Sequence, residues 1–120
     1  MNYPASVSHH AFMIDMLRAD KAFASEYLRT ALEDLDNPDD RAIGLMALRH
    51  VAEAHGGLAL IAREAGISRE ALYRSLSAQG NPTLKTLLAV LHAVGMRLSA
   101  VPAAPSETLP AGVTENTPSP

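Results

Sequence analysis

Residues 58–76, LALIAREAGISREALYRSL, predict two short helices joined by a tight turn. Ala62 lies four residues before Gly66; an alanine lets a second helix cross closely, and glycine accepts the positive φ that such a turn needs. Ser68 follows as an N-cap, because its hydroxyl can accept from the open amides of the next turn. The residues expected to face the core at helical spacing are Ile61, Ala65, Ile67 and Leu72. The stretch therefore predicts a helix-turn-helix.

The second helix of this stretch has a polar outer face made of Arg69, Glu70, Tyr73 and Arg74. A short helix with two outward arginines suits the major groove of DNA. Many helical hairpins with the same small residues bind no nucleic acid, so the spacing alone leaves both possibilities open. The polar loop 79–83 then leads into another apolar helix at 84–94. This order of short helices and a polar, glycine-containing loop resembles the five-helix domain of the phage-repressor and Cro class, which favours DNA binding.

Composition predicts one small helical domain with tails. Aromatic residues make up only 4% of the 120 residues, so the core must use Ala, Leu, Ile and Met, which favour helices. Cysteine is absent, which excludes disulfides and thiolate metal sites. The sequence shows neither an export signal nor an apolar stretch approaching the roughly 20 residues of a membrane span, so we expect a cytoplasmic protein without membrane contact.

The net charge of −3 is distributed unevenly along the chain. Residues 1–39 carry three basic and seven acidic side chains, residues 40–100 carry seven basic and four acidic ones, and residues 101–120 carry two acidic ones. The local net charges are therefore −4, +3 and −2. The basic excess coincides with the proposed DNA-binding region, where attraction to phosphate requires it. Because this excess is modest, we expect a dimer that doubles the contacts with DNA.

The chain before residue 40 divides into a poorly specified segment, 1–18, and an acidic helical segment, 19–39. His9 and His10 are expected to be solvated. Asp20 can cap a helix that runs to about Leu35. Its apolar side comprises Phe23, Tyr27, Leu28, Ala31, Leu32 and Leu35. The acids near its end are either a solvated terminus or a surface for a basic partner, and the candidate partner-binding residues are Phe23, Tyr27, Glu33 and Asp34.

The next expected helix is 38–55, with Asn37 as its cap and Pro38 in its first position. The residues expected to be buried along it are Ile43, Met46, Ala47, Val51 and Ala54. His50 and His55 are five residues apart rather than four and have one acid, Glu53, nearby, so we expect no metal site.

The chain after the helix-turn-helix suggests a second interface. Thr83 or Asn81 begins the helix 84–94, whose apolar face is too wide for one contact and favours a dimer. His92 lies on this helix and is expected to be half-buried in the core or in an interface. Residues 96–101 alternate between apolar and polar, which predicts a short strand that could pair with its copy in a second subunit. Residues 102–120 contain five prolines and are expected to be disordered.

Two stretches resemble a known family. They are DKAFASEYLRTALED at 20–34 and LMALRHVAEAHGGLALIAREAGISREALYRSLSAQGNPTLKTLLAVLHAVGMRL at 45–98, within which GISREALYRSLSAQGNPTL is the most specific run. They are similar to the addiction-module antidote proteins, which are HigA-like antitoxins with a repressor-type helix-turn-helix. The resemblance covers about residues 17–100. It implies a type II toxin–antitoxin operon, a small basic toxin of the RelE/ParE kind as partner, and an antidote dimer that represses its own promoter.

The resemblance also implies roles for individual residues. The recognition-helix positions are Ser68, Arg69, Glu70, Tyr73 and Arg74. Both arginines suit guanine O6 and N7, and Glu70 suits cytosine N4. Phosphate contacts are expected from Ser68 and Asn81, with added charge from Lys85. At two positions the sequence departs from the repressor pattern, and both positions affect the angle at which the helix-turn-helix would dock on DNA. Leu58 stands where a polar residue commonly holds a phosphate, and the apolar anchor expected at 75 is displaced to Leu76.

The sequence thus predicts an all-α protein, a lambda-repressor-like helix-turn-helix domain at 40–101 with an extra N-terminal helix and a short C-terminal strand. We expect it to bind operator DNA as a dimer and to neutralise a toxin. The alternatives are a stand-alone repressor without a toxin and a protein-interaction module that only masks a toxin. We expect no enzymatic activity, no catalytic residue and no cofactor, because the sequence has neither a phosphate-binding glycine loop nor a set of nucleophile and base.

Overall fold

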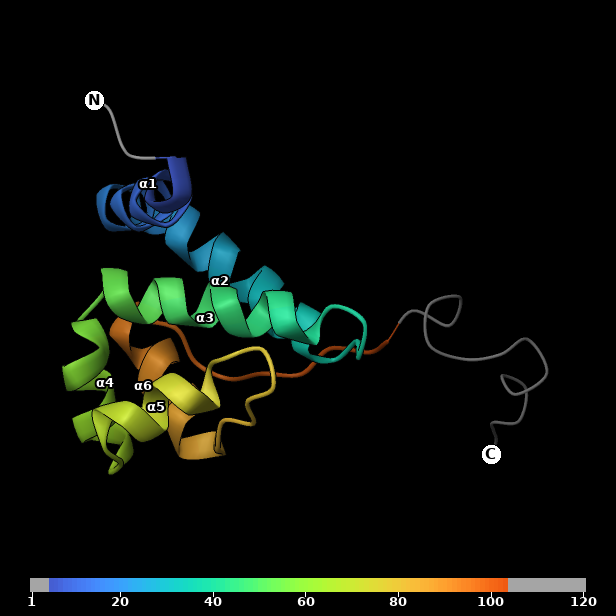
Figure 1. The fold of residues 1–120 in the computed structure, drawn as a ribbon. Coiled ribbons are helices and arrows are strands. Elements are labelled where there is room, and N and C mark those ends of the chain that lie inside the picture. Colours follow the sequence, from blue (N-terminus) through green and yellow to red (C-terminus); the bar gives the residue numbers. More distant parts are fainter. Residues whose placement is uncertain (1–4, 104–120) are drawn as a thin grey trace, which may run out of the picture.

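The central element of the molecule is a single helix, α3, which is covered from two sides. The computed structural model describes residues 5–103, with side chains from residue 9 onward. The helices are α1 (Ala5–Ala19), α2 (Lys21–Leu35), α3 (Arg41–Ala54), α4 (Gly57–Ala65), α5 (Arg69–Ser75) and α6 (Leu84–Ala93). Figure 1 shows α1 and α2 on one side of α3 and the three later helices on the other. The all-α prediction is confirmed for these residues.

The N-terminal part of the chain forms two helices that pack on α3. The sequence indicated little for 1–18, but α1 reaches Ala19 and buries Leu17 completely. Asp20 then caps α2 as expected, because its carboxylate accepts a hydrogen bond from the Phe23 N–H at 3.0 Å. The predicted end of α2 at Leu35 is also confirmed.

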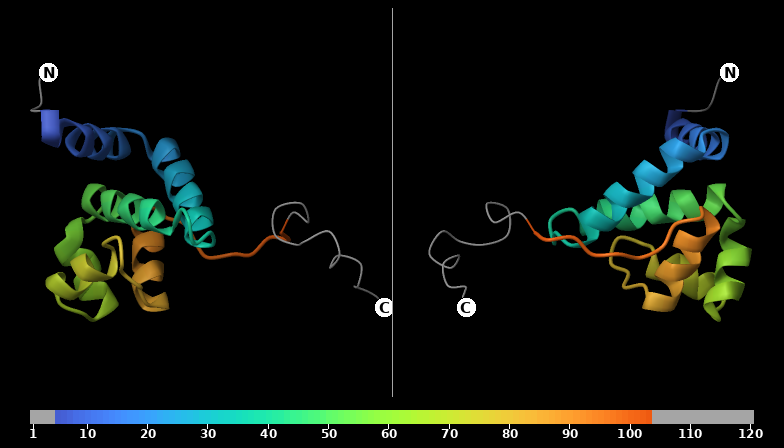
Figure 2. Two further views of the ribbon diagram at one scale, coloured as in Figure 1. Left: turned by 45° about the vertical axis from the view of Figure 1, so that its right-hand side comes forward. Right: turned by 180° about the vertical axis from the view of Figure 1, so that it is seen from behind.

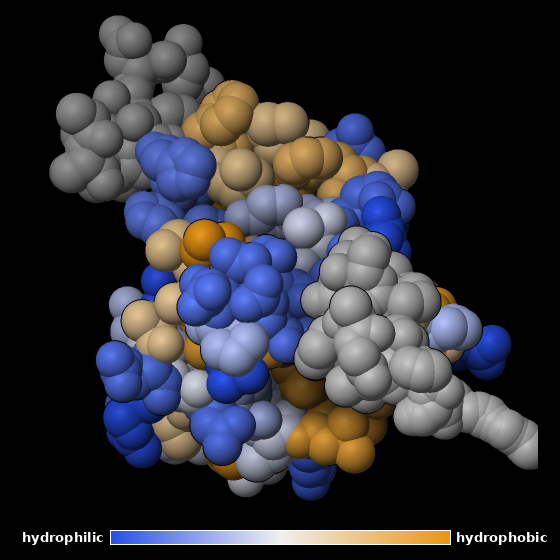
Figure 3. Space-filling view, turned by 90° about the vertical axis from the view of Figure 1, so that its right-hand side faces the viewer, coloured by the Kyte–Doolittle hydropathy of each residue, from blue (hydrophilic) through white to orange (hydrophobic). Residues whose placement is uncertain are grey.

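Helix α3 differs from the prediction at its start. It begins at Arg41, and Pro38 lies in the preceding turn rather than in a first helical position. The Asn37 side chain stabilises this turn instead of capping a helix, since it accepts from the Asp39 N–H at 3.0 Å and donates to Asp40 at 3.2 Å. This turn lies at the end of the molecule seen in Figure 3, where hydrophilic surface extends across the middle between two hydrophobic areas.

The buried side of α3 also differs from the prediction. Ile43 and Met46 are 60% and 39% exposed, whereas Leu45 and Leu48 are buried. The reason is the close approach of α2, which passes over Gly44: a Cβ at Gly44 would lie 2.7 Å from the Ala31 carbonyl oxygen. The helix therefore turns its smallest residue toward α2, and Ile43 faces solvent.

The two short helices and the turn predicted at 58–76 are confirmed. Gly66 has φ of +73°, and the Ile67 N–H donates to the Ala62 carbonyl at 3.0 Å, which closes the end of α4. Ser68 caps α5, accepting from the Ala71 N–H at 3.0 Å. Leu72 is completely buried, as expected of an inward residue of α5.

Helix α6 begins after Thr83 and not after Asn81, since the Thr83 hydroxyl accepts from the Thr86 N–H at 3.1 Å. His92 was expected to be half-buried in the core or in an interface. It is exposed in the single chain, so the expectation of burial in the core is wrong.

The predicted strand at 96–101 is not formed either, because this extended segment has no neighbouring strand among residues 5–103. Instead, Figure 2 shows the segment after α6 running back along the molecule toward the turn between α2 and α3. The part of the expected disordered tail at 104–120 lies outside the described residues. None of the helices within 5–103 has both the length and the apolarity to cross a membrane.

Candidate nucleic-acid interface

Helix α5 presents one exposed face that gathers four of the predicted DNA-binding residues. These are Arg69, Glu70, Tyr73 and Arg74. The opposite side of the helix holds it to the protein, since Leu72 and the following Leu76 are completely buried. Ser75 stands where an apolar anchor was expected, and its hydroxyl donates to the Leu72 carbonyl at 2.8 Å. Leu76 therefore anchors the end of α5, as the sequence indicated.

A glycine in the loop after α5 fixes the position of that helix. A Cβ at Gly80 would overlap the carbonyl groups of Arg74 and Ser75. The Gly80 N–H also donates to the Ser77 carbonyl at 2.8 Å. The loop backbone thus lies directly against the C-terminal end of α5, which only glycine permits. The sequence placed Gly80 in a polar loop but did not reveal this role.

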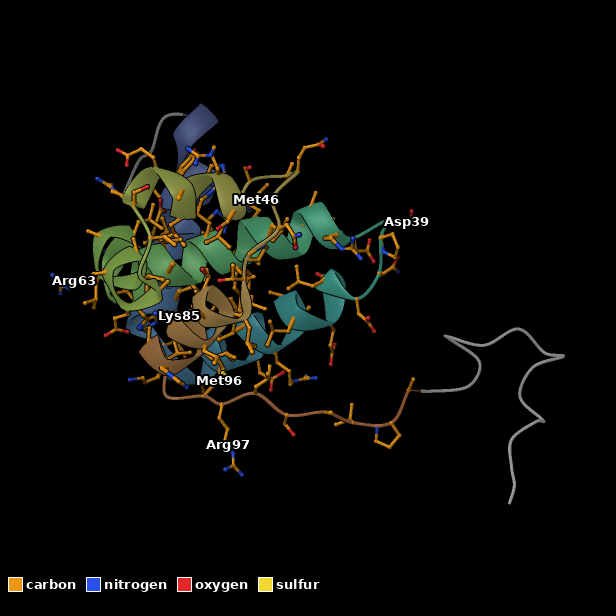
Figure 4. All side chains as sticks on the ribbon, turned by 90° about the horizontal axis from the view of Figure 1, so that it is seen from below. Asp39, Met46, Arg63, Lys85, Met96 and Arg97 are labelled. Atoms are coloured by element: carbon orange, nitrogen blue, oxygen red, sulfur yellow. The ribbon has the colours of Figure 1, made fainter. Side chains whose placement is uncertain are left out.

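The remaining predicted DNA-binding residues flank α5: Ser68 and Lys85 lie at the turn before it, and Asn81 lies in the loop after it. Lys85 lies against the turn, since a Cβ at Gly66 would be 3.2 Å from its Nζ atom. Figure 4 shows Lys85 between α4 and α6, with Arg63 pointing away from the protein. Ser68 is exposed and uses its hydroxyl as the α5 cap, and Asn81 is exposed in the loop. All seven predicted residues therefore lie on α5, on its flanking turn and loop, or on the first turn of α6.

One basic residue beside this face was missed by the sequence analysis. Arg49 of α3 places its guanidinium carbon 5.0 Å from the centroid of the Tyr73 ring. At this distance the cation is attracted to the face of the ring. No sequence motif links two residues 24 positions apart, so only the fold reveals the contact.

The acidic helix α2 uses several of its candidate partner-binding residues within the chain. Glu33 and Glu26 bind the two sides of the Arg29 guanidinium, at 2.8 and 2.7 Å. Arg29 lowers the pKa of Glu26 through its hydrogen bond and its charge. Asp34 is half-buried near Gly44. Glu33 is therefore the exposed member of the predicted acidic pair, and it is already part of a surface ion pair.

The aromatic residues of α2 lead to a buried histidine. The rings of Phe23 and Tyr27 are half-buried, with centroids 5.8 Å apart. His50 is 2% exposed, and its Nδ1 lies 3.1 Å from the Tyr27 hydroxyl. Its Nε2 lies 2.7 Å from His10 Nδ1, so His10 is bonded rather than only solvated as predicted.

This environment affects both titratable partners. Burial raises the pKa of Tyr27. Burial lowers the pKa of His50 to about 4, and electrostatic interactions with His10, Arg49 and His9 act in the same direction. The neutral ring therefore joins α1, α2 and α3. Within 5–103, no set of three or more histidine and acidic side chains is arranged to hold a metal ion.

A groove of about 720 Å³ lies between the C-terminal half of α2, α6 and the segment after α6. Its lining is mostly apolar and comprises Leu32, Leu35, Leu87, Leu91, Met96, Leu98 and Val101, with Arg29, Glu33, Asp36, Arg97 and Ser99 completing it. Leu98 and Val101 are 48% and 83% exposed. The segment 84–101, which was predicted to form a dimer interface, thus contributes accessible apolar residues to this groove.

Comparison with known proteins gives two matches. The sequence profile of the family described as "Probable addiction module antidote protein" matches residues 9–102. A Haemophilus influenzae protein described as "Uncharacterized protein" is 37% identical over 79 residues, which cover 66% of this chain and 80% of that protein. No solved structure matches the chain significantly.

Proposed function

The chain belongs to the family of probable addiction module antidote proteins, and from this premise we propose that it binds operator DNA as a dimer and neutralises a small basic toxin of the RelE/ParE kind. The antidote role implies a cognate toxin as partner. DNA binding, dimerisation and the kind of toxin are the proposed parts. DNA binding is proposed from the exposed face of α5, dimerisation from the apolar groove beside α6, and the kind of toxin from the acidic residues of α2.

The exposed face of α5 carries the proposal of DNA binding. Arg69 and Arg74 form no ion pair with any side chain in the described part of the chain, so their donors are available to a ligand. We propose a lambda-repressor-like docking in which α5 enters the major groove. Both arginines would donate to guanine, and Glu70 would accept from cytosine.

Contacts to the DNA backbone would hold the helix in this position. Ser68 and Asn81 are exposed at the turn and the loop on either side of α5. Both would bind phosphate, and the ammonium group of Lys85 would add charge next to the turn.

Substitution of Arg74 tests the DNA contact. Arg74→Ala should weaken binding to the DNA upstream of the protein's own operon by about 1–3 kcal/mol. Fluorescence anisotropy at one fixed salt concentration measures this affinity, because phosphate contacts make it depend on salt. Lys21→Ala is the matched control: it also removes one exposed positive charge, but from α2 on the other side of α3. Unchanged affinity and base preference in Arg74→Ala would refute the assignment.

The toxin surface is proposed on α2. Its supporting observation is the acidic side formed by α2 and its C-cap, where the exposed Glu26, Glu33 and Asp36 and the half-buried Asp34 outnumber the basic Lys21 and Arg29. A basic partner would be attracted to this side. Phe23 and Tyr27 are half-buried, so part of each ring remains for contact.

A pull-down with the product of the adjacent small gene tests this surface. Glu33→Lys should weaken the complex. Glu64→Lys makes the same change at an exposed residue of α4 and should not weaken it. Absence of a complex at micromolar concentration, together with intact operator binding, would instead indicate a stand-alone repressor.

A further inference from the structure

Arg49 lies over the face of an aromatic ring beside the exposed face of α5. It extends from α3, outside the two helices of the predicted motif, and its guanidinium carbon lies 5.0 Å from the centroid of the Tyr73 ring. Tyr73 is 51% exposed, and Arg49 itself is half-buried. The face of the ring attracts the cation without accepting a conventional hydrogen bond, so the ring can hold the arginine and leave its N–H donors for another ligand.

Within residues 9–103, no carboxylate forms an ion pair with this guanidinium. Glu53 lies one turn further along α3, and Glu70 lies one turn before Tyr73 on α5, yet neither forms an ion pair with Arg49. Among residues 9–103 the ion pairs involve only Arg18 and Arg29 as cations. The positive charge of Arg49 also acts on the neighbouring His50 and helps to lower the pKa of that histidine. An oriented and unpaired guanidinium next to a solvent-exposed face can take an anion.

The position of Arg49 relative to α5 indicates which anion. Lys85 lies against Gly66 at the turn before α5, and Arg49 lies beside Tyr73 near the end of the same helix. A helix in the major groove has phosphates of both strands beside it, so cations near its two ends can each reach the DNA backbone.

We propose that Arg49 binds a DNA phosphate and that Tyr73 serves as a positioning residue for it. The inference rests on the proposed operator binding and extends it. It adds a backbone contact from α3, and it gives Tyr73, so far only a position on the recognition helix, the role of holding a guanidinium. A phosphate contact carries no sequence information, so its loss should weaken binding to all duplexes alike.

The test compares Arg49→Gln and Arg49→Lys with the wild type and with the control Lys21→Ala. Glutamine keeps most of the stem but removes the charge, and thermal melting monitored by circular dichroism verifies that each variant is folded. Fluorescence anisotropy on operator DNA and on an unrelated duplex, over a series of salt concentrations, gives the affinity and its salt dependence. Arg49→Gln should weaken binding to both duplexes by a similar factor, about 5- to 20-fold, and should reduce the salt slope by about one.

Further substitutions separate charge from stacking. Tyr73→Phe keeps the ring and should bind like the wild type, whereas Tyr73→Ala should lose a similar factor to Arg49→Gln on both duplexes. Arg49→Lys should recover only part of the affinity, because lysine has the charge without the planar fork. Wild-type affinity and salt slope in a folded Arg49→Gln would overturn the inference, as would a loss confined to the operator. Failure of the wild type to bind its operator would refute the proposed function itself.

Discussion

Acid should weaken the protein through His50, and replacing this residue should remove most of the effect. The pKa of an unfolded histidine is 6.5, whereas burial holds the pKa of His50 in the folded protein at about 4. Between these values the unfolded chain binds the proton more readily than the folded one. The contribution of the neutral ring to stability is therefore complete above about pH 6.5 and is lost as the pH falls toward 4.

The size of the effect follows from the two pKa values. Linkage gives a loss of about 1.4 kcal/mol at pH 5.5 and about 2.5 kcal/mol at pH 4.5, as upper limits. His50→Gln is the informative change, because glutamine supplies one acceptor and a donor for the Tyr27 hydroxyl and for His10 but does not titrate. His92→Gln removes an exposed histidine and is the matched control.

Urea unfolding followed by circular dichroism at several pH values measures the free energy of unfolding. The wild type and His92→Gln should lose similar amounts on acidification, and His50→Gln should lose less by roughly the values above. Equal losses in the wild type and His50→Gln would show that the buried ring does not control the acid response.

Three further changes test the packing and the proposed interfaces. Gly44→Ala should destabilise the protein by about 1–3 kcal/mol in urea unfolding, because its Cβ would lie 2.7 Å from the Ala31 carbonyl oxygen. Ser68→Ala should cost about 0.5–2 kcal/mol in the same assay through loss of the α5 cap, and an unchanged midpoint would count against the cap. Leu98→Asp should shift a dimer toward monomer in light scattering at tens of micromolar, because Leu98 is 48% exposed beside the apolar groove; a monomeric wild type would reject this interface.

The local features of the fold could be predicted from the sequence where one residue type has a strong conformational preference. Gly66 accepts a positive φ and Ser68 and Asp20 cap helices, and all three are confirmed. Each depends only on atoms a few residues away, so a short stretch contains the whole signal. The exposed residues of α5 followed from the same reasoning.

Features that depend on packing between distant segments could not be predicted. Apolar residues occur on more than one side of α3, so periodicity did not distinguish exposed Ile43 from buried Leu48. The buried side became clear only from the contact of Gly44 with α2. Likewise, His50 finds its partners 23 and 40 residues away, and Arg49 meets Tyr73 only through the fold. The candidate face was thus predictable where it follows α5 and the residues close to it in sequence, and the contribution of Arg49 from α3 was missed.

The two-sided covering of α3 has a consequence for how the protein could be switched off. Residues 36–40 form an exposed turn between the helix with the proposed toxin surface and the helix that supports α5. Exposed polar turns of this kind are favoured sites of proteolytic cleavage. A single cut there would leave α1 and α2 attached to α3 by packing alone, and dissociation of this hairpin would uncover the side of α3 that contains Gly44. Loss of this hairpin would remove the proposed toxin surface and leave the half with the proposed DNA-binding face with an open apolar flank.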